Sequence, residues 1–261
     1  MSCETVADVA VVTLSNPPAN LFDGELTYAL LDAVRRATDN GARAMVIQAD
    51  GAVFSGGADV AQFVGKSAAD ARVFLGEAMR LMSELENAPF PVIAAVHGLC
   101  LAAGLELALA CDLVVAADST QFSQVEATIG AATFLGGAYR LAERCGPARA
   151  REIVFGAGFH DAQTFEKWNI VNRVVAADQL RIEALAWATQ LAKGPTAAHA
   201  VTKRLVRYGL DHGSQQADRY ALDVATPLFE RDDMRSAVGK LLESGARRYM
   251  QNRAEITFEG R

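Results

Sequence analysis

The sequence predicts a layered α/β domain with parallel strand pairing, followed by a helical segment. Short apolar runs rich in valine and alanine alternate with longer amphipathic stretches through the first half of the chain. Strands and helices in alternation are typical of parallel sheets covered by helices. From Arg140 onward the apolar residues recur at helical spacing, which predicts a mainly helical second half.

Each predicted strand is short and ends at a turn signal, such as Ser15-Asn16-Pro17-Pro18 or Asp50-Gly51. The expected strands are residues 9–14, 44–49, 92–96 and 113–116. The expected helices are residues 24–39, 68–86, 104–111, 140–145, 148–155, 161–168, 176–192, 196–208 and 214–229, with a last helix after Asp232. The break around Pro195 predicts a boundary between a core domain, residues 1–194, and a C-terminal helical segment, residues 195–261.

Composition excludes several classes of protein. The chain has 261 residues, of which 51% are hydrophobic and 21% charged, so it is globular and long enough for a sizeable core. A formal net charge of -6 argues against a nucleic-acid partner. The N-terminus lacks a basic region before an apolar stretch, and the longest apolar run, residues 99–111, is too short for a bilayer. We therefore expect no signal peptide and no membrane span.

The four cysteines, Cys3, Cys100, Cys111 and Cys145, form no CxxC pair and have no histidine pair nearby. This pattern predicts neither a metal site nor a disulfide framework. Cys100 and Cys111 lie in apolar surroundings, where they are expected to be small buried hydrophobes. We interpret the cysteine usage as that of a protein in the reducing cytoplasm.

Two segments carry residues suited to chemistry. Residues 54–59 (FSGGAD) form a loop whose small residues allow a ligand to approach the backbone, although such a loop alone is more often an ordinary turn. In the second, a strand and His97-Gly98 precede an apolar helix that contains Glu106. The unpaired N–H groups at a helix start suit an oxyanion. Because Leu105 and Leu107 flank Glu106, its carboxylate is expected to be buried, where it needs an ion-pair or hydrogen-bond partner or has a functional role.

Glu126 is a third candidate, because it lies just beyond a predicted strand end, where loops often carry function. Taken alone it is an ordinary solvated loop acid. Paired with Glu106, it would provide a general acid beside a general base. The spacing does not establish that the two carboxylates meet.

Five stretches of the chain together form a specific pattern: NPPANLF (16–22), FSGGADV (54–60), PVIAAVHGLCLAAGLELALACDLVVA (91–116), TQFSQVEATIG (120–130) and GGAYRL (136–141). On these stretches the chain resembles the crotonase superfamily, which comprises enoyl-CoA hydratases and isomerases, over essentially its full length. The hydratase pattern of that family has one glutamate after a glycine triplet and a second 20 positions later, and Glu106 and Glu126 occupy both positions.

The resemblance implies a spiral of repeated ββα units and a C-terminal segment that mediates trimerisation, giving a homotrimer or a dimer of trimers. It implies an acyl-CoA thioester as substrate, with no metal and no cofactor beyond the coenzyme A of the substrate. The backbone N–H groups of Ala58 and Ala103 would bind the thioester oxygen. Glu106 would act as base toward water and Glu126 would transfer a proton at C2. The implied substrate-binding residues are Gly56, Gly57, Ala58, Asp59, Val60, Gly104 and Phe134, with Lys203 within reach of a coenzyme A phosphate.

The sequence departs from the family pattern in three places. Ala102-Ala103-Gly104 replaces three glycines, and alanine restricts φ. Phe134 replaces a small residue beside the catalytic water, where a ring would reshape the acyl pocket or displace that water. Residues 240–246 lack the usual aromatic and lysine-rich character, which affects the contacts expected for pantetheine and phosphates.

Other charged and titratable groups are expected to be structural. His97 should be hydrogen-bonded in its turn, and Asp112 should form a cap or an ion pair. Lys203, Arg204 and Arg207 lie on one predicted helix and are expected to be solvated.

Three functions remain open at this point. The first is a 2-enoyl-CoA hydratase, supported by the two glutamates. The second is a double-bond isomerase, or another lyase or hydrolase of the same fold; an isomerase would rely mainly on Glu126 and would benefit from Phe134 excluding water. The third is a non-catalytic protein that binds acyl-CoA or RNA. The acidic charge balance disfavours RNA, and the presence of both glutamates disfavours loss of catalysis.

Overall fold

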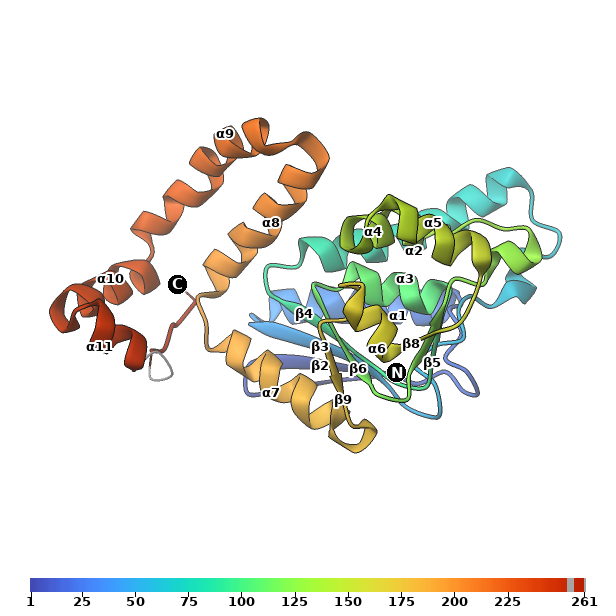
Figure 1. The fold of residues 1–261 in the computed structure, drawn as a ribbon, viewed down its shortest axis with the longest axis horizontal. Helices are drawn as coiled ribbons and strands as arrows, with labels where there is room; N and C mark the ends of the chain where they lie inside the picture. Colours follow the sequence, from blue (N-terminus) through green and yellow to red (C-terminus); the bar gives the residue numbers. More distant parts are fainter. Residues whose placement is uncertain (253–255, 261) are drawn as a thin grey trace.

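A computed structural model of the chain describes residues 1–252 and 256–260. Its centre is a six-stranded sheet in the order β1-β2-β3-β4-β6-β9 (Figure 1). All neighbours in this sheet pair in parallel except β1 and β2, which are antiparallel. The strands are β1 (Ser2–Val6), β2 (Val9–Leu14), β3 (Ala44–Ala49), β4 (Val92–Val96), β6 (Leu113–Ala117) and β9 (Arg173–Val175).

Helices cover both faces of this sheet (Figure 1). Alternate residues of β2 point to opposite faces. Ala10 and Val12 join a core with α1 (Gly24–Asp39), α2 (Ala68–Asn87) and α3 (Ala103–Ala110). Val9 and Val11 instead pack with α7 (Leu180–Ala192). Every residue of β2 is therefore buried, which explains why its sequence is continuously apolar.

A second, three-stranded sheet consists of β5 (Leu99–Leu101), β7 (Gln121–Ser123) and β8 (His160–Asp161). β5 and β7 are parallel, whereas β7 and β8 are antiparallel. The remaining elements of the core are α4 (Gly137–Cys145), α5 (Pro147–Gly156), α6 (Ala162–Lys167) and the short 3-10 helices η1 (Val60–Phe63), η2 (Glu126–Ile129) and η3 (Ala177–Gln179).

The C-terminal helices extend away from the sheet, with α8 and α9 forming an antiparallel hairpin (Figure 1). Tyr208 and Tyr220 stack across this hairpin with ring centroids 4.2 Å apart. The segment comprises α8 (Thr196–His212), α9 (Ser214–Ala225), η4 (Thr226–Glu230), α10 (Asp232–Ser244) and α11 (Ala246–Gln251). Its exposed large apolar residues include Val206, Leu210, Leu222, Phe229, Leu242 and Met250.

The four predicted strands and the helices expected over 24–39 and 68–86 are confirmed to within one residue. The helix expected over 140–145 begins at Gly137, and the helix expected over 176–192 begins at Leu180, after the 3-10 helix η3. Three further expectations are wrong in detail. Pairing is not wholly parallel, because β1 and β8 pair antiparallel. The helix expected over 214–229 ends at Ala225, and Pro227 lies in the 3-10 helix that follows, since proline cannot donate the next helical hydrogen bond. The helix expected over 196–208 continues to His212. In the described part of the chain, no helix has the length and apolar character needed to cross a membrane.

Candidate active site

Three chain segments run side by side in parallel, and each leads into the same region. Ser55 forms a parallel bridge to Cys100 of β5, and β5 pairs with β7 in the register Leu101 to Ser123. Ser55 leads to Ala58, β5 leads to α3 with Glu106, and β7 leads to Glu126 of η2. The carboxyl ends of neighbouring parallel strands lie at one edge, so these groups are brought together.

A cavity of about 150 Å³ lies where these segments end. Both glutamates and both alanines predicted for the site line it, and the rest of its wall is mainly apolar. The lining residues used below are Gly56, Ala58, Val60, Phe63, Phe74, Ala102, Ala103, Glu106, Glu126, Phe134 and Leu135. An apolar cavity with a few convergent polar groups is typical of a ligand site.

The backbone N–H groups of Ala58 and Ala103 are available to a ligand. Phe22 N donates to the Gly57 carbonyl at 2.8 Å and Asp59 N donates to the Phe22 carbonyl at 2.9 Å, so the intervening N–H of Ala58 points the other way. Ala103 is the first residue of α3, where N–H groups have no intrahelical acceptor. Within residues 1–252 and 256–260, neither N–H donates to another protein group.

Ala102, which precedes α3, has φ 46° and ψ −119°. This conformation is one that glycine adopts readily and alanine does not. Hydrogen bonds hold it on both sides, because Ala102 N donates to Ser123 O at 3.0 Å and its carbonyl accepts from Glu106 N at 2.9 Å. Ala102 thus takes a backbone conformation suited to glycine, with strain on the alanine.

Glu106 is 2% exposed and is held by two backbone donors. Its Oε1 accepts from Leu135 N and from Gly137 N, both at 2.8 Å. The pKa of Glu106 is raised to about 7, chiefly by burial; the nearby Glu126 contributes to the rise, while the two N–H donors and Arg140 oppose it. A carboxyl group with such a pKa can exchange a proton near neutral pH.

Glu126 is 8% exposed and begins η2. Burial raises its pKa above the ordinary glutamate value. When the Gln124 amide nitrogen faces this carboxylate, it donates to Oε1 at 2.8 Å and to Oε2 at 3.0 Å. Both acids are therefore fixed by hydrogen-bond donors, and a shared cavity lets one act as base and the other as acid.

Of the other predicted binding residues, Gly56, Val60 and Phe134 line the cavity. Gly57, Asp59 and Gly104 do not line it, but they shape the backbone of the segments that surround it. Gly57 has φ +103°, and Asp59 caps η1 by accepting from Ala61 N at 3.1 Å. A Cβ on Gly104 would lie 2.6 Å from Ser55 Cβ, so this glycine lets α3 approach the loop before Ala58.

Lys203 is not on a solvated face, contrary to the sequence-based expectation. Its Nζ forms an ion pair with Asp112 Oδ2 at 2.7 Å and donates to the carbonyls of Leu85 and Phe90 at 3.2 and 3.1 Å. It also lies outside the cavity lining, so it fastens α8 to the core. The expected pairing of Asp112 is confirmed, as is the hydrogen bond of His97, whose Nε2 lies 3.0 Å from Gly51 O.

Sequence reasoning did not identify the residues that orient the two acids. Leu135 and Gly137 present their N–H groups to Glu106, and Gln124 faces Glu126. The Gly136-Gly137 pair was the available signal: a Cβ on Gly137 would lie 2.4 Å from the Gln124 amide and 3.1 Å from Glu106 Cγ. Only glycine permits that approach.

The fold and the site together define a crotonase-type α/β protein. The crystal structure of enoyl-CoA hydratase subunit I from Geobacillus kaustophilus matches it with a TM-score of 0.90 at 27% identity, covering 100% of this chain and 98% of that chain. DspI from Pseudomonas aeruginosa matches with a TM-score of 0.88 at 27% identity, covering 93% of each chain.

Sequence comparison gives the same result. The model of the family described as enoyl-CoA hydratase/isomerase matches residues 4–253, and the chain belongs to that family. A protein of Rhizobium meliloti named "Probable enoyl-CoA hydratase" is 30% identical over 237 residues, which are 90% of this chain and 91% of that protein. The chain is thus an enzyme of the crotonase superfamily.

Proposed function

We propose that the protein is an enoyl-CoA hydratase that adds water across the C2=C3 bond of a 2-enoyl-CoA thioester. One observation carries this proposal: one apolar cavity is lined by two buried carboxylates and by two backbone N–H groups that have no acceptor among the described residues. The relative from Rhizobium meliloti, named as a probable enoyl-CoA hydratase, is consistent with it.

In the proposed reaction the thioester oxygen accepts from Ala58 N and Ala103 N. Negative charge builds on this oxygen as the enolate forms, and fixed N–H donors in a site with little water stabilise it more than they stabilise the substrate. One such donor contributes about 3 to 4 kcal/mol in other enzymes that use an oxyanion hole.

The carboxylates divide the proton transfers between them. Ionised Glu106 takes a proton from water as the water oxygen bonds to C3 and the C2=C3 π electrons move toward the thioester oxygen. Protonated Glu126 then gives its proton to C2. The substrate gains one water molecule, and return of the proton from Glu106 to Glu126 resets the enzyme. A pKa of about 7 suits Glu106 to the base role.

The proposed substrate brings its own coenzyme A, so the proposed reaction needs no cofactor or metal. We propose a homotrimer or a dimer of trimers in the cytoplasm, with no nucleic-acid or membrane partner. The C-terminal segment supports association, because Leu222, Phe229 and Leu242 are each about two-thirds exposed or more. Apolar side chains in such numbers on one segment mark an interaction surface.

Isomerisation is the second candidate, and Phe134 is the observation that favours it. This ring lines the same cavity as Glu126, where it would reduce the room for water. An isomerase would move a proton between C2 and C4 mainly with Glu126, while Glu106 would assist little.

The test follows crotonyl-CoA through loss of its conjugated thioester absorbance, alongside conversion of a 3-enoyl-CoA. We expect hydration by the wild type, loss of all turnover in Glu126→Gln, and loss of hydration in Glu106→Gln. Conversion of the 3-enoyl-CoA without hydration of any 2-enoyl-CoA would replace the proposal by the isomerase. RNA binding that persists at high salt without thioester turnover would point to a binding protein.

A further inference from the structure

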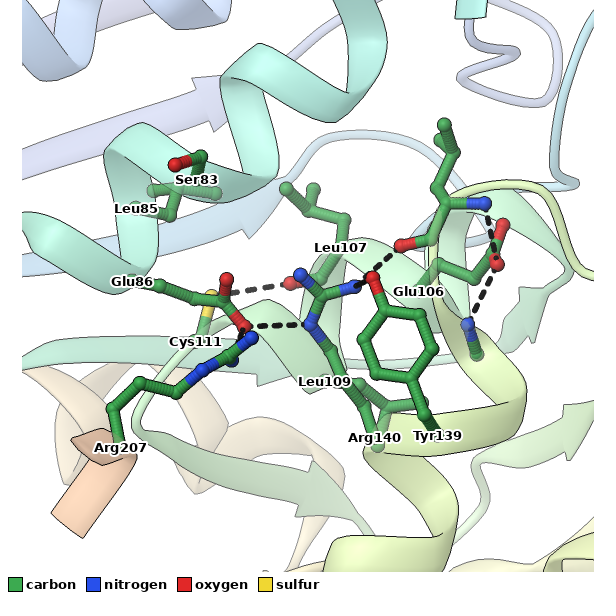
Figure 2. Close-up of polar contacts among 12 residues, drawn as sticks. Ser83, Leu85, Glu86, Glu106, Leu107, Leu109, Cys111, Tyr139, Arg140 and Arg207 are labelled. Atoms are coloured by element: carbon green, nitrogen blue, oxygen red, sulfur yellow. Dashed lines mark hydrogen bonds and ion pairs between the residues drawn. The ribbon is translucent and has the colours of Figure 1, made fainter. Parts of the chain in front are cut away.

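We propose that Arg140 is a positioning residue for Glu106, and that Arg207 of the C-terminal segment supports the same carboxylate through Glu86 (Figure 2). The inference rests on the proposed function, because it treats Glu106 as the base. It goes beyond that function by giving the C-terminal segment a part in arranging the reacting groups.

The first link joins Arg140 to Glu106 through Leu135. Arg140 is 4% exposed, and its Nη1 donates to the Leu135 carbonyl. The N–H of the same residue, Leu135, donates to Glu106 Oε1 at 2.8 Å. Arg140 therefore fixes the short segment before α4 that carries one of the two donors to the carboxylate.

The second link joins Arg140 to the C-terminal segment. Arg140 Nε donates to Glu86 Oε1 at 2.7 Å, and Arg207 Nη1 donates to the same oxygen at 2.8 Å. Glu86 belongs to α2 and Arg207 to α8. One carboxylate oxygen shared by two guanidinium groups sets where Arg140 lies, so contact between α8 and α2 is transmitted to α4.

Arg140 also acts by its charge. The charged groups that face Glu106 are Glu126 of η2, which disfavours ionisation of Glu106, and Arg140 of α4, which favours it. Loss of the Arg140 charge should leave the base harder to ionise. Arg140→Lys should slow the reaction without making Glu106 harder to ionise, because lysine keeps the positive charge but lacks the planar guanidinium that donates several hydrogen bonds.

The experiment compares Arg140→Gln, Arg140→Lys, Arg207→Gln and the control Arg204→Gln, using kcat and KM for crotonyl-CoA from about pH 5 to about pH 9. Arg204 is exposed on the same helix as Arg207. We expect Arg140→Gln to lower kcat by about 10- to 100-fold with little change in KM. In this variant the acidic limb of the pH dependence of kcat should move to higher pH, because Glu106 must be ionised to act. Arg140→Lys should lower kcat without moving this limb. Arg207→Gln should lower kcat by a smaller factor, and Arg204→Gln should match the wild type.

A second readout does not depend on turnover. Carbon-13 NMR of labelled glutamate carboxyls, with Glu106→Gln for assignment, follows the titration of Glu106 directly. A titration of Glu106 that moves to higher pH in Arg140→Gln supports the proposal even if no enoyl-CoA is hydrated, which would refute the proposed function alone. Wild-type titration and wild-type kcat in Arg140→Gln would overturn the inference. If that variant does not fold, wild-type kcat in Arg207→Gln overturns the link to the C-terminal segment.

The geometry points to a second, independent inference, that the acyl group of the substrate is short, with four to about six carbons. It also rests on the proposed function. The cavity of about 150 Å³ must hold the thioester carbonyl, C2, C3 and the rest of the chain. An apolar cavity of about this volume holds one benzene ring, or six carbons. Phe134 packs edge-to-face on Phe63 at 6.4 Å, and Phe63 packs in the same way on Phe74 at 6.2 Å, so three rings form part of the wall.

Its test measures kcat/KM for 2-enoyl-CoAs of four, six and ten carbons, and calorimetric binding of butyryl-CoA and decanoyl-CoA. We expect at least a tenfold preference for the shorter chain, and loss of that preference in Phe134→Ala but not in the exposed control Phe159→Ala. Equal binding of both chain lengths by the wild type would overturn the inference. Binding decides the question without turnover, so a failure of the proposed reaction remains distinguishable.

Discussion

Replacement of Glu106 by Gln should make the protein more stable at alkaline pH while it abolishes hydration. Burial raises the pKa of Glu106 from its ordinary value of 4.5 to about 7. The folded protein therefore keeps a proton that the unfolded chain releases between these pH values. At higher pH the folded protein must hold an ionised carboxylate at 2% exposure, which costs stability.

The magnitude follows from the size of the rise in pKa. One unit of pKa corresponds to about 1.4 kcal/mol, so a rise from 4.5 to about 7 corresponds to about 3 kcal/mol. An acid whose pKa is higher in the folded state destabilises the fold as pH rises. The cost in stability is therefore absent below pH 4.5, grows as pH rises toward 7 and is complete above it. The Gln amide oxygen keeps the acceptor for Leu135 N and Gly137 N.

Urea unfolding of wild type and Glu106→Gln at about pH 5 and about pH 8 measures the effect. The stability gained by the variant should increase from about 1 kcal/mol at the lower pH to about 3 kcal/mol at the higher. Glu183→Gln, at an exposed position of α7, should change stability by less than about 0.5 kcal/mol at both. A Glu106→Gln variant that is less stable than wild type at both pH values would refute the electrostatic account of the site.

Three further substitutions test the structure around the carboxylates. Ala102→Gly should stabilise the fold by about 1 kcal/mol in urea unfolding, since φ 46° suits glycine, whereas Ala108→Gly within helical α3 should destabilise it. Lys203→Met should cost about 2 kcal/mol by removing the ion-pair partner of Asp112, which among the described residues keeps only the Val92 N–H as a donor, yet leave KM for crotonyl-CoA near wild type; a large rise in KM would return Lys203 to the substrate site. Gly137→Ala should lower kcat at least about tenfold, because its Cβ meets Gln124 and Glu106, and an unchanged kcat would contradict the role of the Gly137 N–H.

The central strands could be predicted because burial on both faces leaves a continuous apolar run. β1 could not, because all five of its residues are exposed and it lies at the edge of the sheet. Its sequence, SCETV, therefore carries no burial pattern. Lys203 illustrates a second limit: helical spacing identifies the face on which a residue lies but not the neighbour on that face. Asp112, 91 positions earlier in the numbering, supplies the partner.

The short strands β5 and β7 explain why two glutamates 20 residues apart in the sequence lie at the same cavity. β5 and β7 have three residues each, too few to show a period in the sequence. Their parallel register sets Leu101 beside Ser123, and each glutamate follows its strand by three to five residues. The sequence thus supplies both acids and their spacing, while the pairing that brings them to one cavity is a tertiary property.

The alanines in place of family glycines show which part of the site tolerates substitution. Ala103 begins α3, where a Cβ is accommodated and the N–H stays available. Ala102 bears the strain, with φ 46°, and Ser123 O and Glu106 N hold its two peptide groups. Relaxing Ala102 toward an ordinary φ would break one of those hydrogen bonds and turn the peptide that carries the Ala103 N–H. The strain persists because the hydrogen bond that joins Ala102 to β7 and the one that begins α3 also aim the proposed oxyanion donor, so the fold cannot release the strain without losing that orientation.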